Sequence, residues 1–356
     1  IENKEKTKLI RDAIAAGSVQ HFEDLAPLVP NLNWSGEGSR ARYFQIRGTG
    51  ELEQYEGAPN PSVGFIVDDI DLSGIGGAAT SVDVDRIEVL RGPQGTRYGA
   101  NALAGLGLQP GDAVGSIAWN NHRHVEAYYG VSGSGMVMHT CNPRLQPQQL
   151  IYIINHAEDK AVLFDATFAP LVKGIAAHCP NVQAWICMSD IANMPAIEGV
   201  NNVLCYEDLI APRSEQFEWP EFDERTGAAL CYTSGTTGNP KGVLQSHRAI
   251  VLQTWATCTT DGHNVNSGES ILLAVPMFHV NGWAIPFASA MSGAKLVLPG
   301  SDLSPPAIVE WITTEQVTLS AGVPTIWLST VQHLQRTGQD VPSLRRIAVG
   351  GSAAPR

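Results

Sequence analysis

The stretch Tyr232-Thr-Ser-Gly-Thr-Thr-Gly-Asn-Pro-Lys-Gly-Val243 decides the fold class of most of this chain. Four Ser/Thr hydroxyls, three glycines and one lysine fall within ten of its residues. Glycines let backbone N–H groups turn inward around an anion, hydroxyls add donors, and Lys241 adds a point charge for phosphate oxygens. The Walker pattern is excluded, because Gly242 follows Lys241 where Ser or Thr is required. The stretch predicts a phosphate-binding loop; the alternative is a polar surface loop that binds nothing.

The residues around this loop alternate between strand and helix patterns. The apolar run 228–231 before it predicts a strand, and Ser246 after it is a suitable N-cap for a helix over residues 247–257. Ser304, followed by two prolines, is a suitable N-cap for another helix. Near-continuous apolar runs, typical of buried parallel strands, occupy residues 114–119, 161–164, 271–275 and 295–298, and a helical pattern occupies 148–157. This alternation predicts an α/β fold of layered sheets and helices.

The pattern changes near residue 107, where short alternating runs separated by Gly- and Pro-rich turns give way to the strand-helix alternation. Residues 43–47, 63–67 and 86–89 predict short strands of a small α+β module. Gly74-Ile-Gly-Gly-Ala-Ala79 touches a dinucleotide fingerprint but lacks the preceding βαβ unit, so it predicts a turn. We therefore expect two domains, 1–107 and 108–356.

Composition excludes several classes of function. The formal charge of −12 disfavours a general nucleic-acid-binding role, which needs a basic face. Six cysteines form no CxxC pair and have no zinc-finger spacing, so we expect buried, reduced thiols. The longest apolar runs fall short of the ~18 residues that a membrane-spanning helix needs. The chain begins Ile-Glu-Asn-Lys and ends soon after an apolar run, and we expect that both ends are cut.

The loop Tyr232–Val243 resembles the signature loop of the AMP-forming acyl-CoA synthetase, luciferase and peptide-synthetase adenylation superfamily. Three later segments match the family in order and spacing: Val275-Pro-Met-Phe-His-Val-Asn-Gly-Trp283, Ala321-Gly-Val-Pro-Thr-Ile-Trp327 and Val349-Gly-Gly-Ser-Ala353. With Asn142-Pro-Arg144 upstream, the second core motif is most similar to those of fatty acyl-CoA and methylthiopropionyl-CoA ligases. The resemblance covers residues 108–356.

The resemblance implies an acid-thiol ligase that uses ATP, Mg²⁺ and CoA. The enzyme would convert a fatty acid into an acyl-adenylate and then into acyl-CoA. Thr233 would hold phosphate and Mg²⁺, with the triphosphate wrapped by Ser234, Gly235, Thr236, Thr237, Gly238 and Lys241. Adenine would contact Gly351, Ser352 and Ala353. His279 would lie near the substrate carboxylate and Trp283 would gate the acyl tunnel; they would share a face if the segment is helical. The alternative for both is a buried polar-aromatic pair at a helix start.

The family pattern continues beyond residue 356. Missing from this sequence are a second Mg²⁺ ligand, the ribose-binding Asp, the hinge and the C-terminal domain with the adenylation lysine, so the catalytic residues are unknown. Residues 1–107 take the place of the opening elements of the large domain. We therefore expect an incomplete N-terminal domain of the adenylate-forming fold, with little or no ligase activity by itself.

The first 107 residues resemble the plug domain of TonB-dependent outer-membrane receptors, most specifically over Val84-Asp-Arg-Ile-Glu-Val-Leu-Arg-Gly-Pro-Gln-Gly-Thr-Arg-Tyr-Gly-Ala-Asn101. An ordinary small domain is the alternative. A plug would belong to the outer membrane, whereas a ligase would be cytoplasmic. This mismatch favours a chimera joined near Ala104–Leu108. The competing functional hypothesis is a transport-related plug fragment with a foreign tail.

Overall fold

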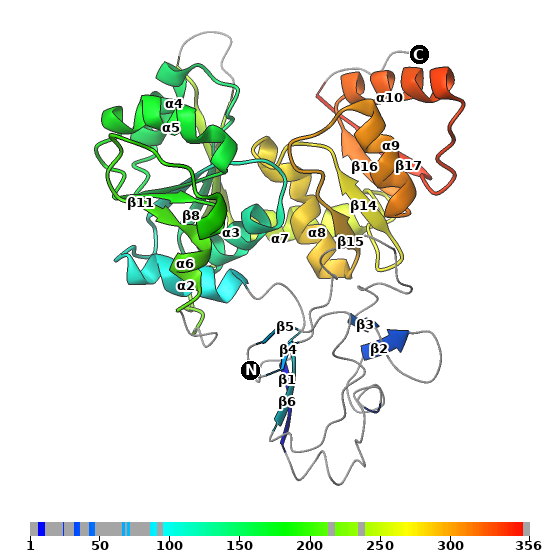
Figure 1. Cartoon of the computed structure of the whole chain (residues 1–356), viewed down its shortest axis with the longest axis horizontal. Helices are drawn as coiled ribbons and strands as arrows, with labels where there is room; N and C mark the ends of the chain where they lie inside the picture. The colour runs from blue at the N-terminus through cyan, green and yellow to red at the C-terminus, as the bar shows by residue number, and fades with distance from the viewer. Residues whose placement is uncertain are drawn as a thin grey trace. The chain divides into compact units, whose positions relative to one another are not determined.

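The structure, a computed structural model, divides the chain into two compact units, Ile1–Pro93 and Gln94–Arg356 (Figure 1). Each unit is described by itself. The residues that the structure describes are 6–10, 24, 32–35, 43–46, 66–67, 70–71, 86–90, 95–212, 218–233 and 239–351. The expected turn at 74–79 lies outside them, as do residues 63–65 of one expected strand.

Three short antiparallel strand pairs make up the described part of the first unit. They are β1 (Lys6–Ile10) with β6 (Arg86–Leu90), β2 (Leu32–Ser35) with β3 (Tyr43–Ile46), and β4 (Ile66–Val67) with β5 (Ile70–Asp71). The strands expected near residues 43–47 and 86–89 are therefore present. The first pair joins the two ends of the unit, because Lys6 is opposite Leu90.

A seven-stranded sheet forms the first half of the second unit. Its order is β11-β10-β9-β7-β8-β12-β13, and neighbours are parallel except for the antiparallel pair β12–β13. The strands are β7 (Ala113–Ile117), β8 (Val137–Thr140), β9 (Ala161–Phe164), β10 (Ala184–Cys187), β11 (Val203–Cys205), β12 (Gly227–Tyr232) and β13 (Gly242–Ser246). Strands β7 to β10 are buried along their whole length, which explains their continuous apolar sequences.

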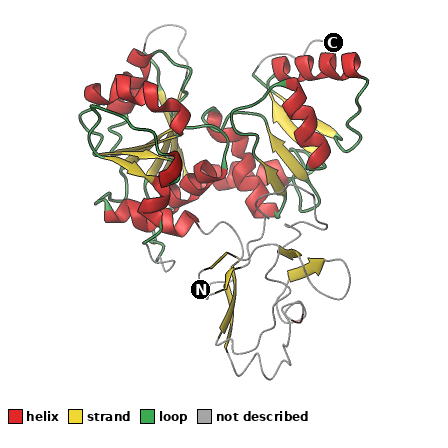
Figure 2. Ribbon diagram, viewed as in Figure 1, coloured by secondary structure: helices red, strands yellow, loops and turns green. Residues whose placement is uncertain are grey.

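Helices cover both faces of this sheet (Figure 2). They are α2 (Gly95–Gly105), α3 (His122–Gly133), α4 (Pro147–His156), α5 (Ala169–Ile175) and α6 (Tyr206–Ile210), with 3-10 turns η3 (Ala166–Phe168), η4 (Ala176–His178) and η5 (Ile191–Asn193). Leu163 of β9 packs in the same core cluster as Tyr128 of α3. Its neighbour Val162 points the opposite way and packs with Leu150 of α4 and Val172 of α5. Successive side chains of β9 therefore pack into two different hydrophobic clusters, one on each face of the sheet.

Helix α2 explains why the second unit begins earlier than the junction expected at residue 107. It packs against α3 and α6, and its side chains Ala100, Ala102 and Leu103 are buried. A small-residue helix allows this close approach. Residues 94–107 are therefore part of the second compact unit.

A four-stranded parallel sheet forms the other half of the second unit, in the order β15-β14-β16-β17. The strands are β14 (Ser270–Leu273), β15 (Lys295–Val297), β16 (Leu319–Gly322) and β17 (Arg346–Val349). Its helical elements are α7 (His247–Cys258), η6 (Val280–Ala284), α8 (Ile285–Ser292), α9 (Pro305–Thr314) and α10 (Pro324–Thr337). The strands expected at 271–275 and 295–298 and the helix after Ser304 are present within one or two residues.

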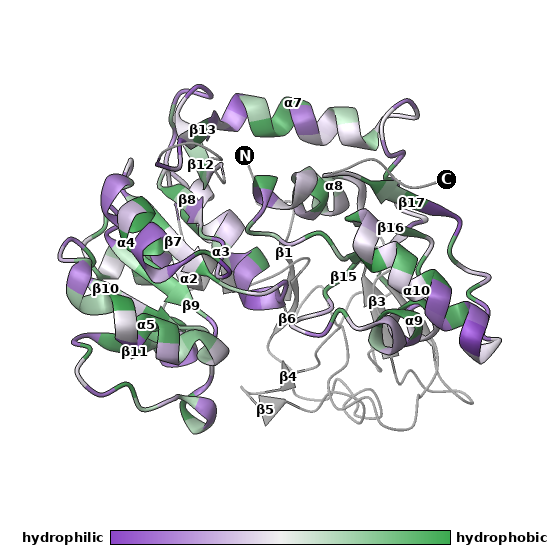
Figure 3. Cartoon of the chain, turned by 90° about the horizontal axis from the view of Figure 1, so that it is seen from above, coloured by the Kyte–Doolittle hydropathy of each residue, from purple (hydrophilic) through white to green (hydrophobic). Residues whose placement is uncertain are grey.

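The two helix caps predicted from sequence have different outcomes. Ser246 caps α7 as expected, since its hydroxyl accepts a hydrogen bond from the Ala249 N–H at 3.2 Å. Ser304 occupies the N-cap position of α9, but its hydroxyl makes no capping bond there. Helix α7 alternates between hydrophilic and hydrophobic residues along its length (Figure 3), and Val251, Leu252 and Trp255 are exposed.

Asn120, just after β7, joins the two sheets of the second unit. Its Nδ2 donates to the carbonyl oxygens of Leu273 and Val275 at 2.7 and 2.8 Å. Its Oδ1 accepts from the Met277 N–H at 2.8 Å. The side chain is buried, and one hydrophobic cluster continues from β7 to β14 around it. The carboxyl ends of β7 and β14 are therefore fixed to each other.

All six cysteines carry free thiols, as predicted, and five of them are buried. Among the described residues there is no helix with the length and apolar character needed to cross a membrane.

Candidate functional site

The predicted phosphate loop connects β12 and β13 at the edge of the seven-stranded sheet. Tyr232 pairs with Gly242 across the two strands, and the Thr233 N–H donates to the Lys241 carbonyl at 3.0 Å. These bonds close the neck of the loop. Thr233 and Lys241 are both exposed, so a hydroxyl and an ammonium group are available on either side of the neck. Ser234, Gly235, Thr236, Thr237 and Gly238 lie outside the described residues.

The predicted substrate residues lie in an unusual turn after β14. From Val280 to Ala284 every φ is positive, between 42° and 64°. Left-handed backbone costs roughly 1–2 kcal/mol per non-glycine residue, and four of these five residues are not glycine. The condition under which His279 and Trp283 would share a helical face is therefore not met. His279 is exposed and Trp283 is half-buried.

Trp283 packs against the predicted adenine segment. A Cβ added to Gly350 would lie 2.5 Å from the Trp283 ring, so only glycine permits this contact. The following Gly351 has φ +87°. The structure thus brings the predicted acyl gate and the start of the predicted adenine segment together. Ser352 and Ala353 lie outside the described residues.

The turn η6 also contacts β12, which leads into the phosphate loop, and α7, which follows β13. The upstream segment Asn142-Pro-Arg144 reaches the same region, because the Arg144 guanidinium lies 6.0 Å from the centre of the Phe278 ring. The phosphate loop, residues 275–283 and residues 142–144 therefore lie close together at the carboxyl ends of the strands. This is where α/β sheets usually bind ligands.

Asn281, in the centre of the left-handed turn, lies within the motif at 275–283, but the sequence predicted no role for it. It is 4% exposed, and within the described structure neither Oδ1 nor Nδ2 has a hydrogen-bond partner. A buried amide without partners costs about 1–3 kcal/mol. Asparagine tolerates positive φ better than most residues, which is the only signal in the sequence that could have marked this position.

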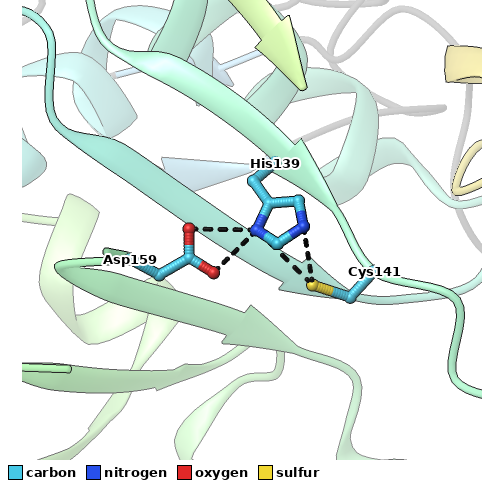
Figure 4. A group of neighbouring side chains, drawn as sticks. All are labelled: His139, Cys141 and Asp159. Carbon is cyan, nitrogen blue, oxygen red and sulfur yellow. Dashed lines mark hydrogen bonds and ion pairs between the residues drawn. The ribbon is translucent and has the colours of Figure 1, made fainter. Parts of the chain in front are cut away.

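A second group that the sequence did not reveal lies beside Tyr232, the last residue of β12: His139, Cys141 and Asp159 (Figure 4). All three are buried. His139 Nδ1 lies 2.8 and 3.0 Å from the two carboxylate oxygens of Asp159. Residues 139 and 141 are two positions apart, so their side chains can point to the same face of an extended chain. The carboxylate that pairs with His139 belongs to Asp159, 20 residues later in the sequence.

Three such ligands can hold a metal ion, but their geometry favours a hydrogen-bonded pair. The Cys141 Sγ is 3.8 Å from His139 Nδ1 and 3.7 Å from Nε2. If one metal ion bound both the sulfur and one ring nitrogen, the sulfur would lie clearly nearer to that nitrogen than to the other ring nitrogen. Burial lowers the pKa of His139, but the Asp159 carboxylate outweighs it and raises this pKa well above its usual value. Burial also raises the pKa of the Asp159 carboxyl.

Comparison with known proteins identifies the family to which most of the chain belongs. The profile of the AMP-binding enzyme family matches residues 96–356, and the chain belongs to this family. A second profile, the TonB-dependent Receptor Plug Domain, matches residues 5–106. The prediction that the chain joins two families is confirmed, and the two matches overlap in α2.

Two of the curated relatives that match the chain are CoA ligases of bacteria. The 3-methylmercaptopropionyl-CoA ligase of Ruegeria lacuscaerulensis is 49% identical over 255 residues, which are 72% of this chain and 47% of the relative. The medium-chain fatty acid–CoA ligase of Ectopseudomonas oleovorans is 48% identical over 256 residues, 72% of this chain and 47% of the relative. The chain thus spans about half the length of these relatives.

Solved structures support the fold. The N-terminal domain of FACL13 from Mycobacterium tuberculosis superposes with a TM-score of 0.61 at 25% identity, covering 74% of this chain and 62% of that one. The long-chain fatty acid–CoA ligase FadD1 of Archaeoglobus fulgidus gives a TM-score of 0.65 at 20% identity, over 74% of this chain and 50% of that one. The expected N-terminal domain fold of adenylate-forming enzymes is confirmed.

Proposed function

We propose that residues 108–356 are the nucleotide-binding half of an AMP-forming acyl-CoA ligase that activates a fatty or methylthio-substituted carboxylic acid. The observation that carries this proposal is the closed β12–β13 neck, which presents the Thr233 hydroxyl and the Lys241 ammonium beside the turn that holds His279 and Trp283. The 45–49% identity to ligases for methylmercaptopropionate and for medium- and long-chain fatty acids supports the substrate class.

The proposed reaction begins with attack of the substrate carboxylate on the α-phosphorus of ATP. The bond from that phosphorus to the bridging oxygen breaks, and pyrophosphate leaves with the electron pair. The CoA thiol then displaces AMP from the acyl-adenylate. This chemistry depends mainly on positioning and on charge neutralisation.

Individual residues fit these tasks. The exposed Lys241 ammonium can neutralise phosphate oxygens, and the exposed Thr233 hydroxyl can serve as an oxygen ligand for Mg²⁺. Ser234, Gly235, Thr236, Thr237 and Gly238 would add the donors of the loop itself. Gly351, Ser352 and Ala353 would contact adenine. The half-buried Trp283 indole would set access to the acyl site, and His279 would lie near the carboxylate.

A plug function for the first unit remains the second candidate, supported by the match of residues 5–106. The ligase half would work in the cytoplasm, with ATP and CoA, and a plug in the outer membrane. No single compartment suits both functions.

The ligase proposal is tested in a hybrid in which residues 108–356 replace the matching segment of the Ruegeria lacuscaerulensis ligase. In this hybrid, Lys241→Ala should lower acid-dependent ATP–pyrophosphate exchange about 100-fold for every acid, because a charged contact to the reacting phosphates is lost. Trp283→Ala should instead alter the preference among short and long acids, since only the apolar wall of the acyl site changes.

Trp255→Ala is the matched control, because that tryptophan is 64% exposed on α7. It should leave both the exchange rate and the chain-length preference unchanged. An equal loss for all acids in Trp283→Ala would refute the gate, and an unchanged rate in Lys241→Ala would refute the phosphate-binding role of the loop.

A further inference from the structure

Tyr232, the last residue of β12, lies between two histidines at the base of the phosphate loop. Its ring centre is 5.1 Å from that of His139 and 5.7 Å from that of His156. Its hydroxyl oxygen is 2.7 Å from His156 Nδ1, a hydrogen bond to helix α4. The next residue, Thr233, makes the bond that closes the loop neck.

The His139 ring is itself held by a hydrogen bond to Asp159. Asp159 binds its Nδ1 at 2.8 Å, and both side chains are fully buried. Space for this carboxylate depends on Gly115 of β7, where an added Cβ would lie 2.8 Å from Asp159 Oδ2. A continuous series of contacts therefore runs from the centre of the sheet through Asp159 and His139 to Tyr232.

The tyrosine ring also lies against the opposite strand of the loop neck. An added Cβ at Gly242 would meet Tyr232 Cζ at 3.1 Å, so the ring covers the backbone of Gly242 closely. Lys241 immediately precedes this glycine. The Tyr232 ring therefore lies directly against the backbone that follows Lys241, with no side chain of residue 242 between them.

We propose that Asp159, His139, Tyr232 and His156 form a support that fixes the neck of the phosphate loop, with His139 and Tyr232 as positioning residues for the nucleotide phosphates. The inference rests on the proposed function for its ligand, but the fixing of the neck is a property of the protein alone. The hydrogen-bonded pair makes His139 a rigid base, and the His156 bond prevents the tyrosine ring from turning away.

The test is hydrogen exchange on the 356-residue chain without nucleotide, read at the Thr233 amide. Tyr232→Phe keeps the ring but loses the bond to His156, and the exchange rate should rise about fivefold, which corresponds to one lost hydrogen bond. His139→Gln should raise it further.

Two controls separate support of the loop from general stability. Tyr152→Phe changes another tyrosine whose ring lies 5.3 Å from His156, and it should leave Thr233 exchange unchanged. The Trp185 amide, bonded to the Asn202 carbonyl at the far side of the same sheet, should keep its exchange rate in Tyr232→Phe. Equal rises at Trp185 and Thr233, or no rise at Thr233 in Tyr232→Phe, would overturn the proposal.

Binding of MgATP to the same variants distinguishes the two proposals. If Tyr232→Phe weakens MgATP binding about fivefold and Tyr152→Phe does not, the support acts on the nucleotide site. If the unaltered chain shows no MgATP binding while Thr233 exchange responds as expected, the support stands and the nucleotide function fails. Unchanged MgATP affinity in Tyr232→Phe would overturn the positioning role.

Discussion

Asn120→Ala is expected to destabilise the second unit by about 4 kcal/mol, because two carbonyl groups and one N–H lose a buried partner at once. The bonds of 2.7–2.8 Å from Asn120 to Leu273, Val275 and Met277 are the polar connection between the ends of β7 and β14. Alanine cannot replace any of them, and water would have to enter the core. Chemical unfolding in urea measures the change.

Asn193→Ala is a suitable control for this prediction. Asn193 is exposed, and its side chain bonds only to the neighbouring Asp190 among the interactions described. Its removal should cost less than about 1 kcal/mol. A loss below about 1 kcal/mol for Asn120→Ala as well would contradict the prediction.

Acidification is expected to cost the second unit about 3 kcal/mol between pH 6.5 and 4, through His124 alone. His124 is fully buried; its Nδ1 is 3.0 Å from the Trp119 carbonyl and its Nε2 is 3.0 Å from the Ser116 hydroxyl. The neutral ring can form both hydrogen bonds: Nδ1–H donates to the Trp119 carbonyl, and Nε2 accepts from the Ser116 hydroxyl. Burial lowers the pKa of His124 from 6.5 to about 4.

The sign of this effect follows from the two states. In the unfolded chain His124 takes up a proton as the pH falls below 6.5, while the folded chain takes it up only near pH 4. The stabilising contribution is therefore complete above pH 6.5 and is lost progressively down to pH 4. His124→Gln removes the titration. The difference in unfolding free energy between the two proteins should change across this range; a constant difference would contradict the prediction.

The sequence predicted those parts of the fold that depend on local pattern. The buried parallel strands β7, β9 and β14 were visible as apolar runs, because side chains on both faces must be apolar. Strand β15 was predicted from the same kind of run, but it lies at the edge of its sheet and only its last residue, Val297, is buried. The loop after β12 was visible as a compact stretch of glycines and hydroxyls, the pattern that predicts anion binding. These signals lie within a few residues of each other, so no knowledge of the tertiary structure was required.

Features that depend on distant contacts were not predictable in this way. The left-handed backbone from Val280 to Ala284 includes Trp283, a residue type that gives no sign of positive φ. The bond from Asn120 to Met277 joins residues that are 157 positions apart. The partnership of His139 with Asp159 depends on strand order. Each requires the three-dimensional arrangement of the sheet before the residues can be associated.

The second compact unit begins at Gln94, before the junction expected at residue 107, for a different reason. Helix α2 carries the end of the plug-like sequence, yet its Ala100, Ala102 and Leu103 are buried in the second unit. The plug profile ends at residue 106 and the AMP-binding profile begins at residue 96. A helix with small apolar residues satisfies either context, so composition alone could not place the junction.

The central claim is that the β12–β13 loop binds nucleotide phosphates, and titration of the 356-residue chain with MgATP tests it most directly. We expect saturable binding that Lys241→Ala weakens about tenfold, the loss of one charged contact worth about 1.4 kcal/mol. Lys173→Ala, which removes an exposed lysine from α5, should bind as the unaltered chain does. Absence of saturable binding, or equal affinity in Lys241→Ala, would contradict the account.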